Sequence, residues 1–461
     1  MAVAYAISEK LVYTKENEYT GNTQYYYRMR YCPVCGTKRQ RCLRIEEEGE
    51  TTAYICKYAP SDKEIETAIG TCWVHEESTN KEFKKLKEIK TIKEPKSKPL
   101  NEETLSFRTE VYNTMKKLLI KYEKENLPKY KGKIIPLYKH HYEDLKKRGL
   151  NDEQILRNGY FSVPISNRKV FAKDGNYKHK ITTAISKDLY DKFGNELLNV
   201  PGFIKLKDQF GNEYITYKTK VSNYLVETDK NGENVVKTDK NGKEMKEYVE
   251  IDGYFIPYER LGNIYALQYR LTKEVYDNKG KKRRYLWYSS KQASSGSPIA
   301  HHIPMNLKRI DVLLVTEGAL KGVIASEFLG FEGLYEAGVG NYNNLLFTLQ
   351  KLEKIVEKKF KIILALDMDK YENPDVLRAE KETIRLLKST GHQVAIAHWP
   401  IEIGKGIDDA LLYLHKLEQK IKEGEQLINE LNTPELKEKA KEKLLQMKQI
   451  YNESKIKYKV V

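Results

Sequence analysis

Hydrophobic and polar positions along the middle of the chain follow two different periods. Apolar residues recur at helical spacing over residues 102–127, and "YEDLKKRGLNDEQILRNGYFSVP" predicts two short helices, the second opened by a capping box from Asn151 to Gln154. Over residues 200–300 the pattern becomes alternating, and Gly and Asn turns separate short predicted strands in "PGFIKL", "YFIPYERLGNIYALQYRL" and "RRYLWYSS". The repeat "ETDKNGENVV" and "KTDKNGKEMK" predicts a protruding β-hairpin insert. The middle of the chain is therefore expected to be a mixed α+β subdomain.

From Asp311 onward, buried strands alternate with helices. Strands are predicted in "DVLLVTEG", "GLYEAGVG", "FKIILALDMD" and "QVAIAHWP", each followed by a helical segment. Strands that alternate with helices imply right-handed crossovers, so we expect an α/β fold with a mostly parallel sheet and flanking helices. After about residue 413, apolar residues at helical spacing predict two further helices separated by Pro434.

Acidic side chains close the predicted strands of this α/β segment. Glu317 ends one strand, Asp367 and Asp369 end another, and Asp408 and Asp409 follow "GKG" after the last. Residues i and i+2 of an extended strand share a face, and the carboxyl ends of parallel strands meet at one edge of a sheet. Like charges held together need a positive charge between them. A cluster of oxygen ligands suits Mg²⁺ or Mn²⁺, so we predict a divalent-cation site there.

The first segment carries all five cysteines of the chain. Cys32 and Cys35 form a C-x-x-C turn in "YCPVCGTK", and Cys56 and Cys72 follow across two alternating segments. This pattern predicts a small β zinc ribbon with one Zn²⁺ held by Cys32, Cys35, Cys56 and Cys72. His75 is an alternative ligand because it lies in C-x-x-H spacing with Cys72, and Cys42 is left outside the ligand set. A redox pair or unconnected thiols are the competing interpretations.

The net charge of the chain suggests what kind of partner it binds. Lys and Arg number 81 against 65 Asp and Glu, which gives a net charge of +16 and suits a polyanion such as nucleic acid. No apolar stretch approaches the roughly 20 residues that span a bilayer, and "MAVAYAISEK" lacks the basic start and apolar run of a signal peptide. We therefore expect a cytoplasmic protein without membrane contact, whose cysteines are thiols or metal ligands.

The motifs "TEG", "ALDMD" and "GKGIDD" resemble the glutamate and DxD motifs of the Toprim domain, over residues 311–412. That domain is shared by bacterial-type primases, topoisomerases and some nucleases. A zinc ribbon before it, and the "LKKRGLNDEQILRNGYFSVP" and "YFIPYERLGNIYALQYRL" stretches, are similar to primases and primase-like proteins of mobile elements. The predicted division of the chain is a zinc ribbon over 1–76, a helical linker over 77–130, a primase-like subdomain with the hairpin insert over 131–310, the Toprim domain over 311–412 and C-terminal helices over 413–461.

By this resemblance, the protein is expected to be a DNA primase-like nucleotidyltransferase. It would use a single-stranded DNA template and nucleoside triphosphates and make short RNA primers with help from Mg²⁺ or Mn²⁺. The C-terminal helices could dock a replicative helicase, or pack on their own Toprim domain. The resemblance implies catalytic or metal-binding roles for Glu317, Asp367, Asp369 and Asp408, a capping alternative for Asp409, and phosphate, nucleotide or template contacts for Lys321, Arg270, Arg283 and Arg284.

Two other classes of function stay open at this point. A Toprim nuclease or another strand-cleaving enzyme would use the same acids, but the chain has no G-x-x-x-x-G-K-[ST] motif for an accompanying ATPase. A topoisomerase needs a tyrosine nucleophile domain and a large gate, for which the chain is short. A non-catalytic single-stranded-DNA-binding module would leave the full set of acids without a purpose.

Overall fold

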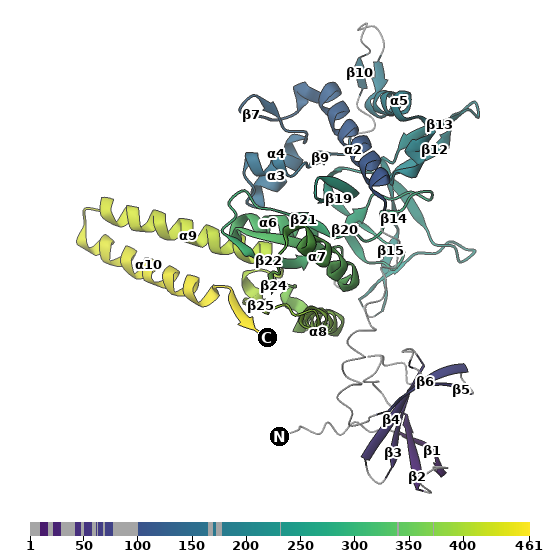
Figure 1. Cartoon of the computed structure of the whole chain (residues 1–461). Helices are drawn as coiled ribbons and strands as arrows, with labels where there is room; N and C mark the ends of the chain where they lie inside the picture. Colours follow the sequence, from purple (N-terminus) through teal and green to yellow (C-terminus); the bar gives the residue numbers. More distant parts are fainter. Residues whose placement is uncertain are drawn as a thin grey trace. The chain divides into compact units, whose positions relative to one another are not determined.

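The computed structural model describes residues 10–16, 22–28, 42–47, 50–57, 61, 63–67, 70–76, 100–164, 169–171, 178–230, 232–338, 341–371 and 373–461. These residues belong to two compact units, 1–92 and 93–461, which are described separately (Figure 1). Cys32, Cys35 and residues 77–99 of the linker predicted over 77–130 lie outside the described residues.

The first unit contains a six-stranded antiparallel sheet in the order β1-β2-β3-β4-β6-β5. One face of the sheet carries an apolar cluster that includes Tyr26, Ile45 and Ile55. Alternation along each strand places these side chains on the same side, as expected for a sheet with one buried face. The strands are β1 Lys10–Glu16, β2 Thr23–Arg28, β3 Leu43–Glu47, β4 Glu50–Cys56, β5 Lys63–Thr67 and β6 Gly70–Glu76.

The second unit begins with the mixed α+β part that the sequence predicts. The long helix α2, Glu102–Glu123, is capped by Asn101 and packs its apolar face on a four-stranded sheet in the order β20-β19-β18-β9. The capping box of Asn151 and Gln154 is present at the start of α4. The elements are β7 Lys129–Tyr130, β8 Lys133–Ile134, α3 Lys139–Lys147, α4 Asp152–Arg157, β9 Phe161–Ser162, β10 Lys169–Phe171, β11 Lys178–Lys180, α5 Ile181–Phe193, β18 Gly253–Arg260, β19 Asn263–Tyr276 and β20 Lys282–Trp287.

The predicted hairpin insert is confirmed as a run of antiparallel ladders between α5 and β18. β14 pairs with β17, and β15 pairs with β16 across the first Asp-Lys-Asn-Gly turn. Gly232 and Gly242, the glycines that end the two copies of the repeat, have φ values of 80° and 75°, which glycine adopts without steric cost. The strands are β12 Phe203–Lys207, β13 Glu213–Tyr217, β14 Lys220–Tyr224, β15 Val226–Thr228, β16 Asn234–Val236 and β17 Lys246–Glu250.

The α/β part contains a second six-stranded sheet, in the order β21-β23-β22-β24-β25-β26. The four central strands are parallel, and the two edge strands are antiparallel. The expected mostly parallel pairing is therefore present, and helices on both sides bury its apolar residues in two clusters. The elements are β21 Ala300–His302, β22 Arg309–Glu317, α6 Ala319–Leu329, β23 Phe331–Glu336, α7 Tyr342–Val356, β24 Lys361–Leu364, α8 Pro374–Ser389, β25 Val394–His398 and β26 Lys457–Val460.

Two long helices connect β25 to β26. α9, Ile407–Glu430, and α10, Pro434–Ser454, form an antiparallel pair that extends away from the sheet (Figure 1). Pro434 starts α10, as predicted, because its fixed φ suits the first helical turn. α9 runs without a break across residue 412, and the strand that follows α10 joins the sheet edge. None of the helices in the described ranges is long and apolar enough to cross a membrane.

Candidate active site and metal-binding residues

The acids of the α/β part gather at the carboxyl ends of β22 and β24 and the start of α9. Glu317 is the last residue of β22, and Gly318, at a φ of 82°, turns the chain into α6. β24 ends at Leu364, so our prediction that an extended strand runs on to Asp369 is wrong. The backbone N–H of Met368 donates to the carbonyl of Lys405, and a 3₁₀ turn (Met368–Tyr371) replaces the strand ladder.

Two lysines supply positive charge between Asp367 and Asp369. Lys321, on the first turn of α6, is ion-paired with Asp367 Oδ1. The Nζ atom of Lys405 lies 2.7 Å from Asp369 Oδ2 and 3.8 Å from Asp367 Oδ2. Burial alone would lower the pKa of Lys321, but the surrounding carboxylates, Asp367 foremost, raise it above its usual value. The repulsion between the two aspartates is therefore relieved by the chain's own side chains.

Asp408 joins this group from the first turn of α9. Its side chain is buried, and its Oδ1 atom has no hydrogen-bond partner among the described residues. A Cβ on Gly406 would lie 2.6 Å from that oxygen and 3.1 Å from Cε of Lys321, so the second glycine of "GKG" leaves space for both. Burial and the neighbouring Asp409 raise the pKa of Asp408. A buried carboxylate oxygen without a donor is a suitable ligand for a cation.

Glu317 differs electrostatically from the aspartates. Burial raises its pKa, and the carboxylates of Asp367 and Asp369 add to the effect, while Lys321 and Lys405 oppose it. A carboxylate with a raised pKa can accept and release a proton closer to neutral pH than an ordinary glutamate. Proton transfer is thus a role that this environment favours for Glu317.

Glu336 is a residue of this site that our sequence reasoning missed. It ends β23 and is the direct register partner of Glu317 on β22. Its side chain is buried, and Oε2 has no hydrogen-bond partner among the described residues. Burial and the charge of Glu317 raise the pKa of Glu336 to about 8. The feature that could have identified Glu336 is its position at the end of the strand adjacent to the one that carries Glu317.

The raised pKa of Glu336 predicts how stability depends on pH. The folded protein keeps this proton up to about pH 8, whereas the unfolded chain loses it near the ordinary value of 4.5. Stability should therefore fall as pH rises through this window, by up to about 1.4 kcal/mol per pH unit from this group. Glu336→Gln should remove this contribution. In urea unfolding, the free energy of unfolding of the variant should equal that of the wild type near pH 5 and exceed it near pH 9. A variant that is less stable than the wild type at pH 9 would contradict a buried, protonated Glu336.

Arg148 is a second residue that the sequence did not reveal. It follows α3, and its Nη1 atom lies 3.6 Å from Asp408 Oδ2 while Nε lies 3.5 Å from Asp144 Oδ2. Arg270 is buried on β19, with Nη1 2.9 Å from Asp144 Oδ2 and Nε donating to the Tyr285 hydroxyl at 3.1 Å. A chain of charged contacts therefore connects Arg270, a predicted site residue, to the carboxylate group.

Arg283 and Arg284 have other partners. Arg283 pairs with Asp277 at 2.7 Å, and Arg284 lies 3.6 Å from Glu274, both within the β19–β20 region. Neither arginine forms an ion pair with the carboxylate group in the described part of the chain. Their proposed contacts with template or nucleotide thus stay predictions, as do the catalytic roles of the acids.

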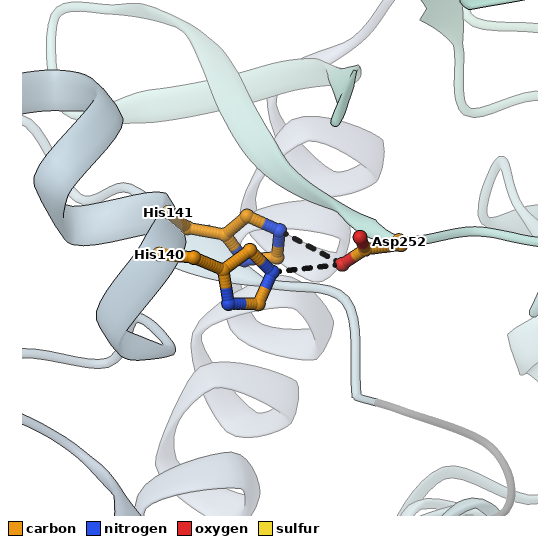
Figure 2. Close-up of side chains that lie close together, drawn as sticks. All are labelled: His140, His141 and Asp252. Atoms are coloured by element: carbon orange, nitrogen blue, oxygen red, sulfur yellow. Dashed lines mark hydrogen bonds and ion pairs between the residues drawn. The ribbon is translucent and has the colours of Figure 1, made fainter. Parts of the chain in front are cut away.

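A trio of possible metal ligands is formed by two histidines of α3 and the aspartate that precedes β18 (Figure 2). His140 and His141 point their Nε2 atoms at Asp252 Oδ1, at 2.9 and 3.2 Å, and His141 Nδ1 is 2.7 Å from the Ser162 hydroxyl. Among the described residues this is the only trio whose ligand atoms all lie within 4.8 Å of one another. The hydrogen bonds from His141 and His140 hold the pKa of Asp252 well below its usual range. Because these bonds account for the arrangement, we assign no metal to it.

The donor atoms of the acidic group nevertheless suit a magnesium site. Mg²⁺ keeps several waters and is usually held by one or two protein carboxylates, so a tight trio is not required. All donors here are carboxylate oxygens, and the buried Oδ1 atoms of Asp369 and Asp408 have no partner among the described residues. Lys405 is 57% exposed and free to leave Asp369. The residues present therefore fit a divalent cation at Asp367 and Asp369.

In the first unit, the described cysteines separate onto two faces of the sheet. Cys56 is the register partner of Trp73, so the neighbouring Cys72 points to the opposite face, within the apolar cluster of Ile45 and Ile55. Cys42 lies directly before β3, and its Sγ atom is 3.8 Å from Sγ of Cys56. Two thiolates on one tetrahedral zinc, with Zn–S of about 2.3 Å, stand about 3.8 Å apart.

The register thus favours Cys42 over Cys72 as a ligand alongside Cys56. His75, our alternative ligand, is the register partner of Tyr54, which lies two positions before Cys56 on β4. His75 therefore shares a face of the sheet with Cys56. The two thiols of the C-x-x-C turn lie outside the described residues. The sulfur spacing and the donor types fit zinc.

Comparison with known proteins adds a family without an assigned function. A model named "Domain of unknown function (DUF3854)" matches residues 308–416, which nearly coincide with the predicted Toprim segment. No curated protein matches the chain.

Several solved structures are similar to parts of the chain. The zinc-binding and RNA polymerase domains of the Aquifex aeolicus primase share 14% identity, with a TM-score of 0.37 over 75% of this chain and 74% of that one. The RNA polymerase domain of Mycobacterium tuberculosis primase DnaG, in complex with a double-stranded DNA oligomer with an overhang, shares 11% identity, with a TM-score of 0.38 over 74% and 97%. A Pseudomonas aeruginosa DNA primase domain shares 13%, with a TM-score of 0.36 over 73% and 95%. At these TM-scores the likeness carries no argument, and the function must be argued from the residues.

Proposed function

We propose that this protein is a DNA primase-like nucleotidyltransferase that makes short RNA primers on single-stranded DNA. The observation that carries the proposal is the meeting of acids from three chain positions at one sheet edge: Glu317, the Asp367–Asp369 pair and Asp408. Nucleotidyl transfer needs acidic ligands for a divalent cation, a proton acceptor and cations for phosphate, and this edge offers all three. The motifs that resemble the Toprim domain support metal-assisted chemistry on nucleic acid, and the primase-like stretches that precede them favour a primase over a nuclease.

Each residue of the edge has a role in this proposal. Asp367 and Asp369 hold Mg²⁺ or Mn²⁺, with Asp408 as a further ligand. When bound, the cation lowers the charge on the triphosphate and eases ionisation of the attacking 3′ hydroxyl. Glu317 takes the proton of that hydroxyl, because its raised pKa suits proton transfer. Lys321 and Arg148, both within reach of the carboxylates, bind phosphate oxygens.

The experiment that tests this function is a primer-synthesis assay. The protein is incubated with single-stranded DNA, labelled ribonucleoside triphosphates and Mg²⁺ or Mn²⁺, and short labelled RNA products are expected. Cleavage of the DNA without nucleotide incorporation would instead support the alternative, a Toprim nuclease or strand-cleaving enzyme. Binding of DNA with neither reaction would support a non-catalytic single-stranded-DNA-binding module.

DNA binding is expected to depend strongly on salt. The excess of Lys and Arg gives the chain a net charge of +16, and cations that neutralise phosphates release counterions. The affinity for single-stranded DNA should fall about tenfold or more between roughly 50 and 200 mM salt. Fluorescence anisotropy across a salt series measures this, and an affinity that stays constant would rule out the basic surface as the binding element.

The first unit and the C-terminal helices have supporting roles in the proposal. The zinc ribbon contacts the template, and we revise its ligands to Cys32, Cys35, Cys42 and Cys56. The α9–α10 pair is a proposed docking element for a replicative helicase, since it extends from the sheet and exposes Leu427, Leu436 and Leu445.

A further inference from the structure

A cavity with a positively charged wall lies apart from the carboxylate edge. Its volume is about 310 Å³, and it is bounded by α2, the end of β18, the segment before β21, and α7. The wall carries the cations Arg108, Arg260 and Lys351 and no carboxylate. None of the acids assigned to the active site lines it.

Arg108 is the most informative residue of this wall. Its side chain projects from α2 and is only 5% exposed. Nη1 donates to the backbone carbonyl of Tyr265 at 3.0 Å, but the buried Nε–H has no partner among the described residues. No carboxylate in the described part of the chain pairs with it, and burial lowers the pKa of Arg108. A buried guanidinium without a counter-charge is costly, so an anion from outside the chain would stabilise it.

The other two cations are held by neutral partners. Arg260 donates from Nη1 to the Thr348 hydroxyl at 2.7 Å, and its guanidinium lies 4.3 Å from the centre of the Tyr265 ring. Lys351 Nζ lies 4.6 Å from the centre of the Phe347 ring. Neither Arg260 nor Lys351 forms an ion pair within the described ranges of the chain, and Lys351 is exposed. The cavity therefore combines one buried cation, Arg108, and two more accessible ones with two aromatic rings.

A serine-rich turn completes the wall with neutral donors. Ser294, Ser295 and Ser297 flank Gly296, whose φ of 65° makes the turn possible. The side-chain amides of Asn341 and Asn344 donate to the Ser297 carbonyl at 2.7 and 3.1 Å, which holds the turn against α7. The Ser295 hydroxyl donates to the Tyr288 carbonyl at 3.0 Å, so the donors that this turn offers to phosphate oxygens are the hydroxyls of Ser294 and Ser297.

We propose that this cavity binds the phosphate group of a small phosphorylated molecule of about mononucleotide size. The volume is at the lower end of the range for ligand pockets, and Tyr265 and Phe347 offer apolar surface for a ring next to the phosphate-binding cations. Because its wall shares no acid with the carboxylate edge, binding should not require a divalent cation. The inference is independent of the proposed primer synthesis.

Thermal unfolding of the full chain tests the proposal. In phosphate-free buffer without added Mg²⁺ or Mn²⁺, inorganic phosphate and adenosine monophosphate should each raise the Tm by about 2 °C or more at saturation. A lower half-saturating concentration for adenosine monophosphate would identify a nucleotide as the ligand, and equal concentrations would identify the phosphate group alone. Leaving out Mg²⁺ and Mn²⁺ excludes cation-dependent binding at the aspartates and keeps the proposed zinc in place.

Arg108→Met provides the decisive variant. This substitution should lower the affinity for both ligands at least tenfold. Without ligand, the Tm of the variant should equal or exceed that of the wild type, because a buried charge without a counter-charge is removed. Lys117→Met is the matched control, since it removes a cation from the exposed face of the same helix. Should Arg108→Met fail to fold, Arg260→Met provides the second test of ligand binding. A wild type that neither ligand stabilises, or stabilisation that both arginine variants retain, would overturn the proposal.

Discussion

Asp369→Asn is expected to reduce primer synthesis by about 100-fold or more while the protein stays folded. The substitution removes one charge from the proposed cation site with little change in shape, and metal-assisted transfer depends on that charge. Among the described residues, its only ion-pair partner is the half-exposed Lys405, so little stability should be lost. The measurement combines the primer-synthesis assay with titration of Mg²⁺ or Mn²⁺, whose apparent affinity should also fall.

Asp367→Asn should reduce primer synthesis as much as Asp369→Asn does, but it should also lower the stability of the fold. Lys321 is 22% exposed and pairs with Asp367, so the variant leaves a largely buried ammonium without its partner. We expect a loss of about 1–3 kcal/mol in the free energy of unfolding, in contrast to the gain expected if only carboxylate repulsion mattered. Glu317→Gln should also abolish synthesis, but with a smaller loss of metal affinity, because its proposed role is proton transfer.

A matched control lies near the start of β22, the strand that ends at Glu317. Asp311 is an exposed acid near the start of β22, paired with Arg309 at 2.8 Å and Lys361 at 3.2 Å. Asp311→Asn should leave primer synthesis unchanged. Wild-type activity in both the Asp367 and Asp369 variants would place the chemistry elsewhere in the chain. Unfolding of the Asp369 variant would mean that this acid is structural.

Periodicity along the sequence was sufficient to predict most elements of the second unit. The alternation of strands and helices after Asp311 predicts the parallel strands, because each helical segment is long enough for a crossover. Local signals also predicted the capping box at Asn151 and the start of α10 at Pro434. These features depend on residues that are only a few positions apart, so they can be recognised from the sequence alone.

The contacts that define the candidate site are of a different kind. Arg148 meets Asp408 across 260 positions of the chain, and Lys405 reaches Asp369 only because its loop passes beside the 3₁₀ turn. No periodic pattern in the sequence predicts contacts between residues that are so far apart along the chain. The sequence therefore predicted four of the acids at the sheet edge, but not Glu336, and not that two lysines of the chain would stand between the aspartates. The end of β24 was misplaced for the same reason, since a backbone bond to the carbonyl of Lys405 replaces strand pairing.

Cys42→Ser is expected to release zinc from the first unit, whereas Cys72→Ser should retain it. Cys42 and Cys56 share a face of the sheet with sulfurs 3.8 Å apart, as two thiolates on one zinc require, but Cys72 lies in the apolar cluster on the other face. Loss of the ion should destabilise this unit strongly, because structural zinc contributes folding energy directly. Cys72→Ser should instead place a hydroxyl among apolar side chains, at a cost of about 1–3 kcal/mol without loss of metal.

Elemental analysis of the two purified variants, with Cys32→Ser as a positive control for release, decides between the ligand sets. We expect one zinc per chain in the wild type and in Cys72→Ser, and a much lower content in Cys42→Ser and Cys32→Ser. Cobalt substitution gives a second readout, since each thiolate ligand adds sulfur-to-metal charge-transfer absorption that a serine cannot supply. A zinc-free Cys72→Ser protein together with a zinc-loaded Cys42→Ser protein would restore the ligand set deduced from spacing alone, and would mean that the strand register near Cys56 differs in the metal-bound protein.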